Sequence, residues 1–155
     1  MQPIIAKQIL PWFGGTSAVW TTALVFFQVV LLAGYSYSHW ITGRLAARTQ
    51  SNLHIALLVA SLAFLPIIPN PLLKPAGEED AALRIILLLT ATIGLPYLLL
   101  ATTGPLLQKW IAPRFAHKSV YRLFALSNFG SLIGLLAFPF VIEPYAASVL
   151  QSWVW

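Results

Sequence analysis

Long runs without charge constrain this chain more than any other feature. No Asp, Glu, Lys or Arg occurs in the 36 residues after Lys7, the 25 after Arg48, the 24 after Arg84 or the 20 after Arg122. A helix needs about 20 residues to cross a hydrocarbon layer about 30 Å thick. Each of the four runs is therefore long enough to span a bilayer.

The composition points to the same class of protein. Charged residues make up 8% of the 155 residues and apolar residues 59%, whereas a soluble domain carries about 25% charged residues. Four apolar runs leave too little polar chain to cover them in water, and the length suits one domain. We predict an all-α, polytopic helical bundle, with residues 1–155 forming a single integral-membrane domain. The chain has no cysteine, which excludes disulfides and thiolate chemistry.

About four transmembrane helices follow from the runs. We do not expect the first to begin at Gln8, because Pro11 and the Gly14-Gly15 pair disfavour a helix there. Thr16 or Ser17 offers an N-cap instead. The second helix is the shortest and ends in a proline-rich stretch. The predicted helices cover about 17–41, 53–68, 83–107 and 123–142.

The third predicted helix is interrupted. Gly94 and Pro96 lie near its middle and Pro105 near one end, and each proline frees the carbonyl four residues earlier, those of Thr92 and Ala101. Hydroxyls of nearby threonines can help to satisfy these carbonyls; the threonines are Thr90, Thr92, Thr102 and Thr103. The interruption predicts a kink, and broken helices also line binding sites in some transporters.

The charges predict an orientation. Loops 42–52 and 109–122 hold six of the nine basic residues, and the opposite side, with the N-terminus, loop 72–82 and the C-terminus, holds all four acids. The positive-inside rule therefore places loops 42–52 and 109–122 in the cytoplasm. Because orientation accounts for the basicity, we expect no nucleic-acid partner. Segment 110–121 either lies flat on the inner leaflet or is a solvated loop.

Polar residues within the spans mark faces that look toward other helices or a cavity. Gly130 and Gly134 form a small-xxx-small pair that permits close helix packing. Such residues serve helix packing or line a substrate or proton pathway. The weak candidates for substrate binding are Gln28, Asn128, Thr92 and Thr102.

Aromatic residues gather near both predicted membrane boundaries, as is typical of interfacial belts. Trp12, Phe13 and Trp20 belong to the outer boundary, and Tyr35, Tyr37, Trp40, Trp110 and Tyr121 to the inner one. The histidines at 39, 54 and 117 are too far apart in sequence for a helical metal pair. We expect ordinary interfacial or loop positions for them, and no metal site.

No catalytic set is visible in the sequence. Glu78, Glu79 and Asp80 form one loop run, and Glu143 stands alone beside Pro144. A paired acid and base has no obvious place, and phosphate-cradling or zinc motifs are absent. We expect no catalytic residue and no cofactor in this chain, and therefore no enzyme activity of this chain alone.

Several segments of the chain form recognisable motifs: 2–7 (QPIIAK), 10–15 (LPWFGG), 18–22 (AVWTT), 26–28 (FFQ), 32–35 (LAGY), 94–97 (GLPY), 102–110 (TTGPLLQKW) and 121–131 (YRLFALSNFGS), ending in Pro139 and Glu143-Pro144. Together they resemble the membrane region of one family, the bacterial spermidine-synthase-like fusion proteins with a major-facilitator-like membrane region. The resemblance covers nearly the whole chain.

The resemblance implies an inner-membrane module that precedes a cytoplasmic Rossmann-type domain, aminopropyltransferase-like or methyltransferase-like, absent from this chain. The cofactor, S-adenosylmethionine or its decarboxylated form, would belong to that domain. We also expect the chain to be a piece of a larger membrane protein, because both ends look like parts of further helices. The leading hypothesis is an anchoring or scaffolding module in the bacterial inner membrane, whose partners are the bilayer, other transmembrane helices and the Rossmann-type domain. The alternative is a small-molecule transporter or channel module.

Overall fold

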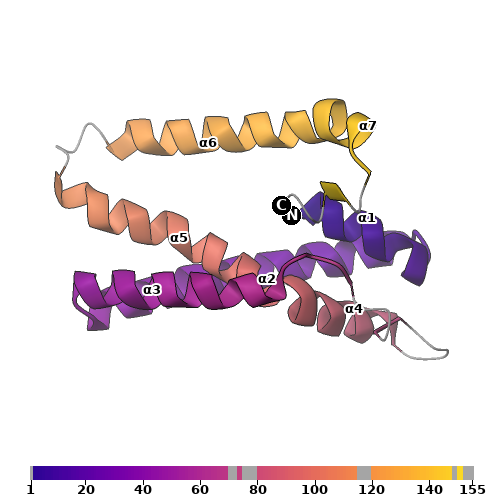
Figure 1. The fold of residues 1–155 in the computed structure, drawn as a ribbon, viewed down its shortest axis with the longest axis horizontal. Helices are drawn as coiled ribbons and strands as arrows, with labels where there is room; N and C mark the ends of the chain where they lie inside the picture. Colours follow the sequence, from indigo (N-terminus) through magenta and orange to yellow (C-terminus); the bar gives the residue numbers. More distant parts are fainter. Residues whose placement is uncertain (1, 70–72, 75–79, 115–119, 148–149, 152–155) are drawn as a thin grey trace.

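The computed structural model describes residues 2–69, 73–74, 80–114, 120–147 and 150–151, and within these residues the chain is helical with no strand. Figure 1 shows its main helices. In chain order the elements are α1 (Gln2–Phe13), α2 (Ser17–Arg44), α3 (Ala47–Ser61), the 3-10 turn η1 (Leu62–Phe64), α4 (Ala81–Leu89), the π-helical turn η3 (Thr90–Gly94), α5 (Leu95–Ile111), the 3-10 turn η4 (Ala112–Arg114), α6 (Val120–Ala137), the π-helical turn η6 (Phe138–Ile142) and α7 (Glu143–Tyr145).

The first long helix begins where the sequence predicts. Gly14 has φ of +68°, a left-handed conformation that glycine adopts without a steric penalty, and α2 starts at Ser17 with Thr16 in the N-cap position. The Thr16 side chain makes no capping hydrogen bond. Helix α1 before this turn was not predicted, because Pro11 was taken as a helix breaker. Pro11 instead lies in the last turn of α1, where it removes the one hydrogen bond that its N–H would make to the Lys7 carbonyl and so weakens only the end of the helix.

Helix α1 folds back along α2 for only part of its length. Its 12 residues are about 18 Å long, while the 28 residues of α2 are about 42 Å long. Figure 1 shows α1 beginning beside the middle of the bundle.

The connection between α2 and α3 is much tighter than the predicted loop 42–52. Only Leu45 and Ala46 separate the two helices. Helix α3 then begins earlier and ends earlier than the predicted 53–68, because alanine and polar residues from Ala47 on are compatible with a helix and Pro66 restricts the residue before it. At 15 residues, about 22 Å, α3 is shorter than a bilayer core.

Helical backbone continues through the predicted interruption. Asp80 caps α4, its side chain accepting hydrogen bonds from the N–H groups of Ala82 and Leu83. The irregularity takes the form of the π-helical turn η3, and Pro105 lies inside α5. Threonine hydroxyls were expected to bond to the freed carbonyls of Thr92 and Ala101, but none of the described hydroxyl bonds does so. Thr90, Thr102 and Thr103 donate to carbonyls four residues earlier, those of Ile86, Leu98 and Leu99.

An apolar core joins α1, α2, α4 and η3. The Phe27 ring packs edge-on against the rings of Phe26 and Tyr97, with centroids 5.4 and 5.0 Å apart. Buried aliphatic side chains from all four elements, together with Ile67 from the segment after η1, complete the core: Ile5, Ile9, Val19, Ala23, Ile67, Ile85, Leu88, Leu89 and Ile93.

Three helices in the described part are long and apolar enough to cross a membrane: Ser17–Arg44, Ala81–Ile111 and Phe124–Tyr145. The sequence had predicted about four, and α3 falls short of the required length. Figure 1 shows the α2–α3 turn and the far end of α5 at one end of the molecule, with the α1–α2 turn and α7 at the other. This arrangement agrees with the prediction that loops 42–52 and 109–122 share a side.

Candidate functional site

The closest helix contact lies between α2 and α5 at Gly34. A Cβ atom at this glycine would lie 3.0 Å from Cβ of Ala101 and 3.1 Å from the carbonyl oxygen of Leu98. The buried Thr102 hydroxyl donates to the Leu98 carbonyl at 2.7 Å and lies 3.3 Å from the Gly34 carbonyl oxygen. Glycine therefore permits α5 to approach α2 closely enough for a polar contact across the interface.

A cluster of polar contacts joins α2, α3 and α5 at the end with the α2–α3 turn. The Gln50 side-chain amide donates to the Leu45 carbonyl at 2.7 Å, and the Trp110 indole N–H donates to Oε1 of Gln50 at 2.8 Å. Gln50 is buried. One side chain thus satisfies a carbonyl at the end of α2 and fixes the end of α5 against α3.

His54, one turn further along α3, continues the cluster. Its Nε2 atom lies 2.9 Å from the hydroxyl of Thr103, which itself donates to the Leu99 carbonyl. Because that hydroxyl proton is used, the geometry assigns the proton of neutral His54 to Nε2 and leaves Nδ1 an acceptor. Nδ1 of His54 and the hydroxyl of Tyr37 on the neighbouring α2 are buried without a hydrogen-bond partner among the described residues.

Two grooves lie where α3 gives way to the proline-rich segment. The larger, about 340 Å³, is apolar apart from one hydroxyl and is lined by Leu58, Val59, Ser61, Leu62, Leu65, Pro96 and Leu100. The smaller, about 280 Å³, lies between residues 63–68 with Leu73 on one side and the π-helical turn η3 on the other, with Thr92 on its wall. Irregular backbone next to a π-helical turn is a common setting for functional sites.

The four predicted substrate-binding candidates have different surroundings. Gln28 on α2 and Asn128 on α6 are exposed, whereas Thr92 and Thr102 are buried. No contact among the described residues joins the four into one site. Thr102 stabilises the α2–α5 contact, and Thr92 borders the smaller groove.

Sequence reasoning missed Gln50 and underestimated His54. Gln50 fell in a predicted loop, and His54 was expected at an ordinary interfacial position, but both are buried. Gln50 and His54 are four residues apart and therefore lie on one face of α3. A predicted helix that began before Gln50 would have revealed this shared polar face. Trp110 was expected in the aromatic belt, and its indole N–H bonds to Gln50.

Helix α6 differs from the rest of the bundle. Over Phe124–Tyr145 none of the described side chains is buried, and a Cβ atom at Gly130 or Gly134 would meet nothing within 4 Å. Figure 1 shows α6 running apart from α2 and α3. The predicted small-xxx-small pair therefore contacts no described helix of this chain.

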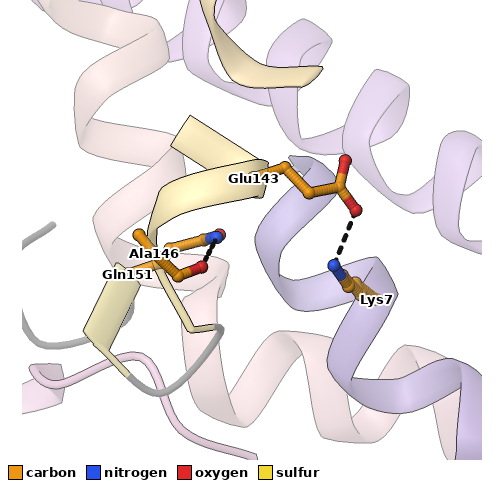
Figure 2. Close-up of polar contacts among 4 residues, drawn as sticks. All are labelled: Lys7, Glu143, Ala146 and Gln151. Atoms are coloured by element: carbon orange, nitrogen blue, oxygen red, sulfur yellow. Dashed lines mark hydrogen bonds and ion pairs between the residues drawn. The ribbon is translucent and has the colours of Figure 1, made fainter. Parts of the chain in front are cut away.

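An ion pair connects α7 to α1. Figure 2 shows Nζ of Lys7 and Oε1 of Glu143 facing one another, 2.6 Å apart. The two side chains are 48% and 40% exposed. Nearby, the buried Gln151 donates its amide to the Ala146 carbonyl at 2.7 Å, also drawn in Figure 2. These contacts stabilise the turn after α7.

Among the described residues no three His, Asp or Glu side chains gather as metal ligands would. Comparisons with protein-family models, with curated proteins and with solved structures found no match.

Proposed function

We propose that this chain is a membrane module that anchors and scaffolds a larger assembly, with α6 as the helix that packs against further transmembrane helices. The observation that carries the proposal is that none of the described side chains over Phe124–Tyr145 is buried. In a bilayer, exposed apolar side chains pack favourably against lipid tails, but these tails offer no hydrogen-bond partner to the amide of Asn128. The helix therefore gains by packing against a partner.

One face of α6 is built for such packing. Ser127, Gly130, Ser131 and Gly134 follow the i, i+3, i+4, i+7 spacing that places residues on one side of a helix. Small residues at this spacing let a second helix approach closely, and hydroxyl and amide groups bond across the contact. Asn128 flanks the same face.

The resemblance to spermidine-synthase-like fusion proteins suggests which domain the module scaffolds. On that basis the module precedes an aminopropyltransferase-like or methyltransferase-like Rossmann domain on the cytoplasmic side of a bacterial inner membrane. Any S-adenosylmethionine-type cofactor belongs to that domain. Sequencing the DNA on both sides of this reading frame tests this part of the proposal. A downstream strand with a glycine-rich turn supports it, and an unrelated downstream sequence contradicts it.

Photo-cross-linking in membranes tests the α6 interface itself. A photoreactive residue at Ser131 should yield a polypeptide adduct of defined mass, while one at Leu136 on the opposite face should yield lipid adducts. Gly130→Leu with Gly134→Leu should abolish the polypeptide adduct. Gly104→Leu on α5 is the matched control, because a Cβ there also meets nothing within 4 Å. Lipid adducts alone from both positions would overturn the interface.

Transport of a small molecule is a second candidate, favoured by the irregular segment beside η3. The larger groove contains one polar side chain, Ser61, so it suits an apolar ligand better than a cation, and anchoring remains the preferred function. Uptake of labelled spermidine into proteoliposomes, compared between the wild type and Thr92→Val, tests transport. Uptake that falls in Thr92→Val supports it, and uptake no faster than in empty liposomes excludes it for this cation.

A further inference from the structure

Positive charge is concentrated at the end of the bundle that holds the α2–α3 turn. Arg44 lies in the last turn of α2, Arg48 at the start of α3 and Lys109 in the last turn of α5, and all three are exposed. Residues 42–52 and 109–122 contain no Asp or Glu. The end therefore carries cations without any acid in its own segments to neutralise them.

The electrostatics of helix ends explain the positions of Arg44 and Lys109 but not the position of Arg48. A cation near a helix C-terminus is favourable, because the unpaired carbonyls there carry partial negative charge. Arg48 is at the N-terminal end of α3, where the free N–H groups are already partly positive. Its position strengthens an electropositive surface rather than the helix, and helix N-termini also attract phosphate groups.

Hydrogen bonds of a buried side chain hold the helix ends that carry this charged surface in place. Buried Gln50 bonds to the Leu45 carbonyl and accepts from the indole of Trp110, which ties the ends of α2, α3 and α5 together. Lys109 is the immediate neighbour of Trp110 in the chain. These contacts fix the backbone positions from which the cations project, which reduces the cost of bringing them to one anion.

An exposed aromatic side chain places this charge beside apolar surface. The guanidinium of Arg44 lies 5.3 Å from the centroid of the Trp40 ring, a cation–π arrangement. Along the same helix Leu32 and Val29 are exposed by 66% and 60%. A ligand that fits both regions has an anionic head and an apolar tail, and tryptophan is enriched at the depth where the two meet.

We propose that this end is a binding surface for anionic phospholipids, with Arg44, Arg48 and Lys109 contacting the phosphate-bearing headgroups. The surface selects negatively charged lipid over zwitterionic lipid, a property that the positive-inside orientation alone does not require. The apolar flank of α2 favours a lipid over a nucleic acid, which has no acyl chain. The proposal is independent of the anchoring role of α6.

Electron spin resonance of the reconstituted chain tests this proposal. The relative association of spin-labelled phosphatidylglycerol over phosphatidylcholine is measured in phosphatidylcholine vesicles. Each basic residue near an anionic surface contributes roughly a fivefold preference, equivalent to about 1 kcal/mol. We expect Arg44→Gln, Arg48→Gln and Lys109→Gln each to reduce the preference by up to about fivefold, and the triple variant to abolish it. Lys74→Gln is the control.

Lys74 suits this purpose because it is exposed and its neighbour Leu73 packs on the apolar core, away from Gln50. An absence of preference in the wild type, or a preference that the triple variant keeps, would overturn the proposal. So would displacement of phosphatidylglycerol by inorganic phosphate at equal concentration. If the triple variant fails to fold, the wild type is measured at about 1 M salt, where screening acts over about 3 Å. A preference unchanged at that salt concentration also overturns the proposal.

Discussion

The contact at Gly34 gives the sharpest prediction about stability. Gly34→Ala inserts a Cβ atom 3.0 Å from Cβ of Ala101, 3.1 Å from the Leu98 carbonyl oxygen and 3.3 Å from the Thr102 hydroxyl. Two of these neighbours cannot rotate away, so α2 and α5 must separate by a few tenths of an ångström. Inserting a methyl group into a packed interface costs about 1–3 kcal/mol.

A second glycine on the same helix provides the control. A Cβ atom at Gly43 meets nothing within 4 Å. Both Gly→Ala changes gain helix propensity of up to about 1 kcal/mol, so this gain largely cancels when the two variants are compared. Gly34→Ala should therefore be less stable than Gly43→Ala by about 1–3 kcal/mol.

The assay is equilibrium unfolding in mixed micelles with increasing denaturing detergent, followed by far-ultraviolet circular dichroism. The wild type, Gly34→Ala and Gly43→Ala are measured under identical conditions. Equal free energies of unfolding for the two variants would refute the close approach of α2 and α5 at Gly34.

Three further predictions concern polar contacts. Gln50→Leu removes the acceptor of the Trp110 indole and should lower the free energy of unfolding by about 1 kcal/mol, because a partly buried donor loses its partner. An unchanged value in the same unfolding assay contradicts the contact. Lys7→Glu should destabilise the chain by about 0.2–1 kcal/mol through repulsion from Glu143, and the double reversal with Glu143→Lys should restore stability; failure of this rescue argues against the pair. Thr102→Val should cost about 0.6 kcal/mol, the average for a polar contact between membrane helices, as measured by the same unfolding curves.

The sequence predicted the features of this fold that depend on single residues. Gly14 ends one helix and lets α2 begin at Ser17, since only a residue tolerant of positive φ suits that turn. Long apolar runs predicted α2, the α4–α5 helix and α6, because their length alone matches a bilayer. The interruption near Gly94 was predicted, and its form, a π-helical turn, was not.

The misplaced elements have separate causes. Helix α1 was missed because Pro11 was taken as a helix breaker. The predicted start of the next helix excluded charged and polar residues, but backbone helicity does not stop at such residues, so α3 begins at Ala47 and contains Arg48 and Gln50. This shift hid the polar cluster around Gln50 and His54, which depends on α3 packing against α5. The spacing of Gln50 and His54 places both on one face of α3, but it does not show which helix that face packs against.

Topology mapping tests the central claim most directly, namely that the chain is a membrane module whose α2–α3 turn and α5–α6 connection lie in the cytoplasm. Reporters are fused after Arg48, Glu79 and Arg114. The arrangement requires α3 and the proline-rich segment together to return the chain across the membrane. We expect cytoplasmic signals after Arg48 and Arg114 and an external signal after Glu79. The reverse pattern, or one side for all three positions, would contradict the account.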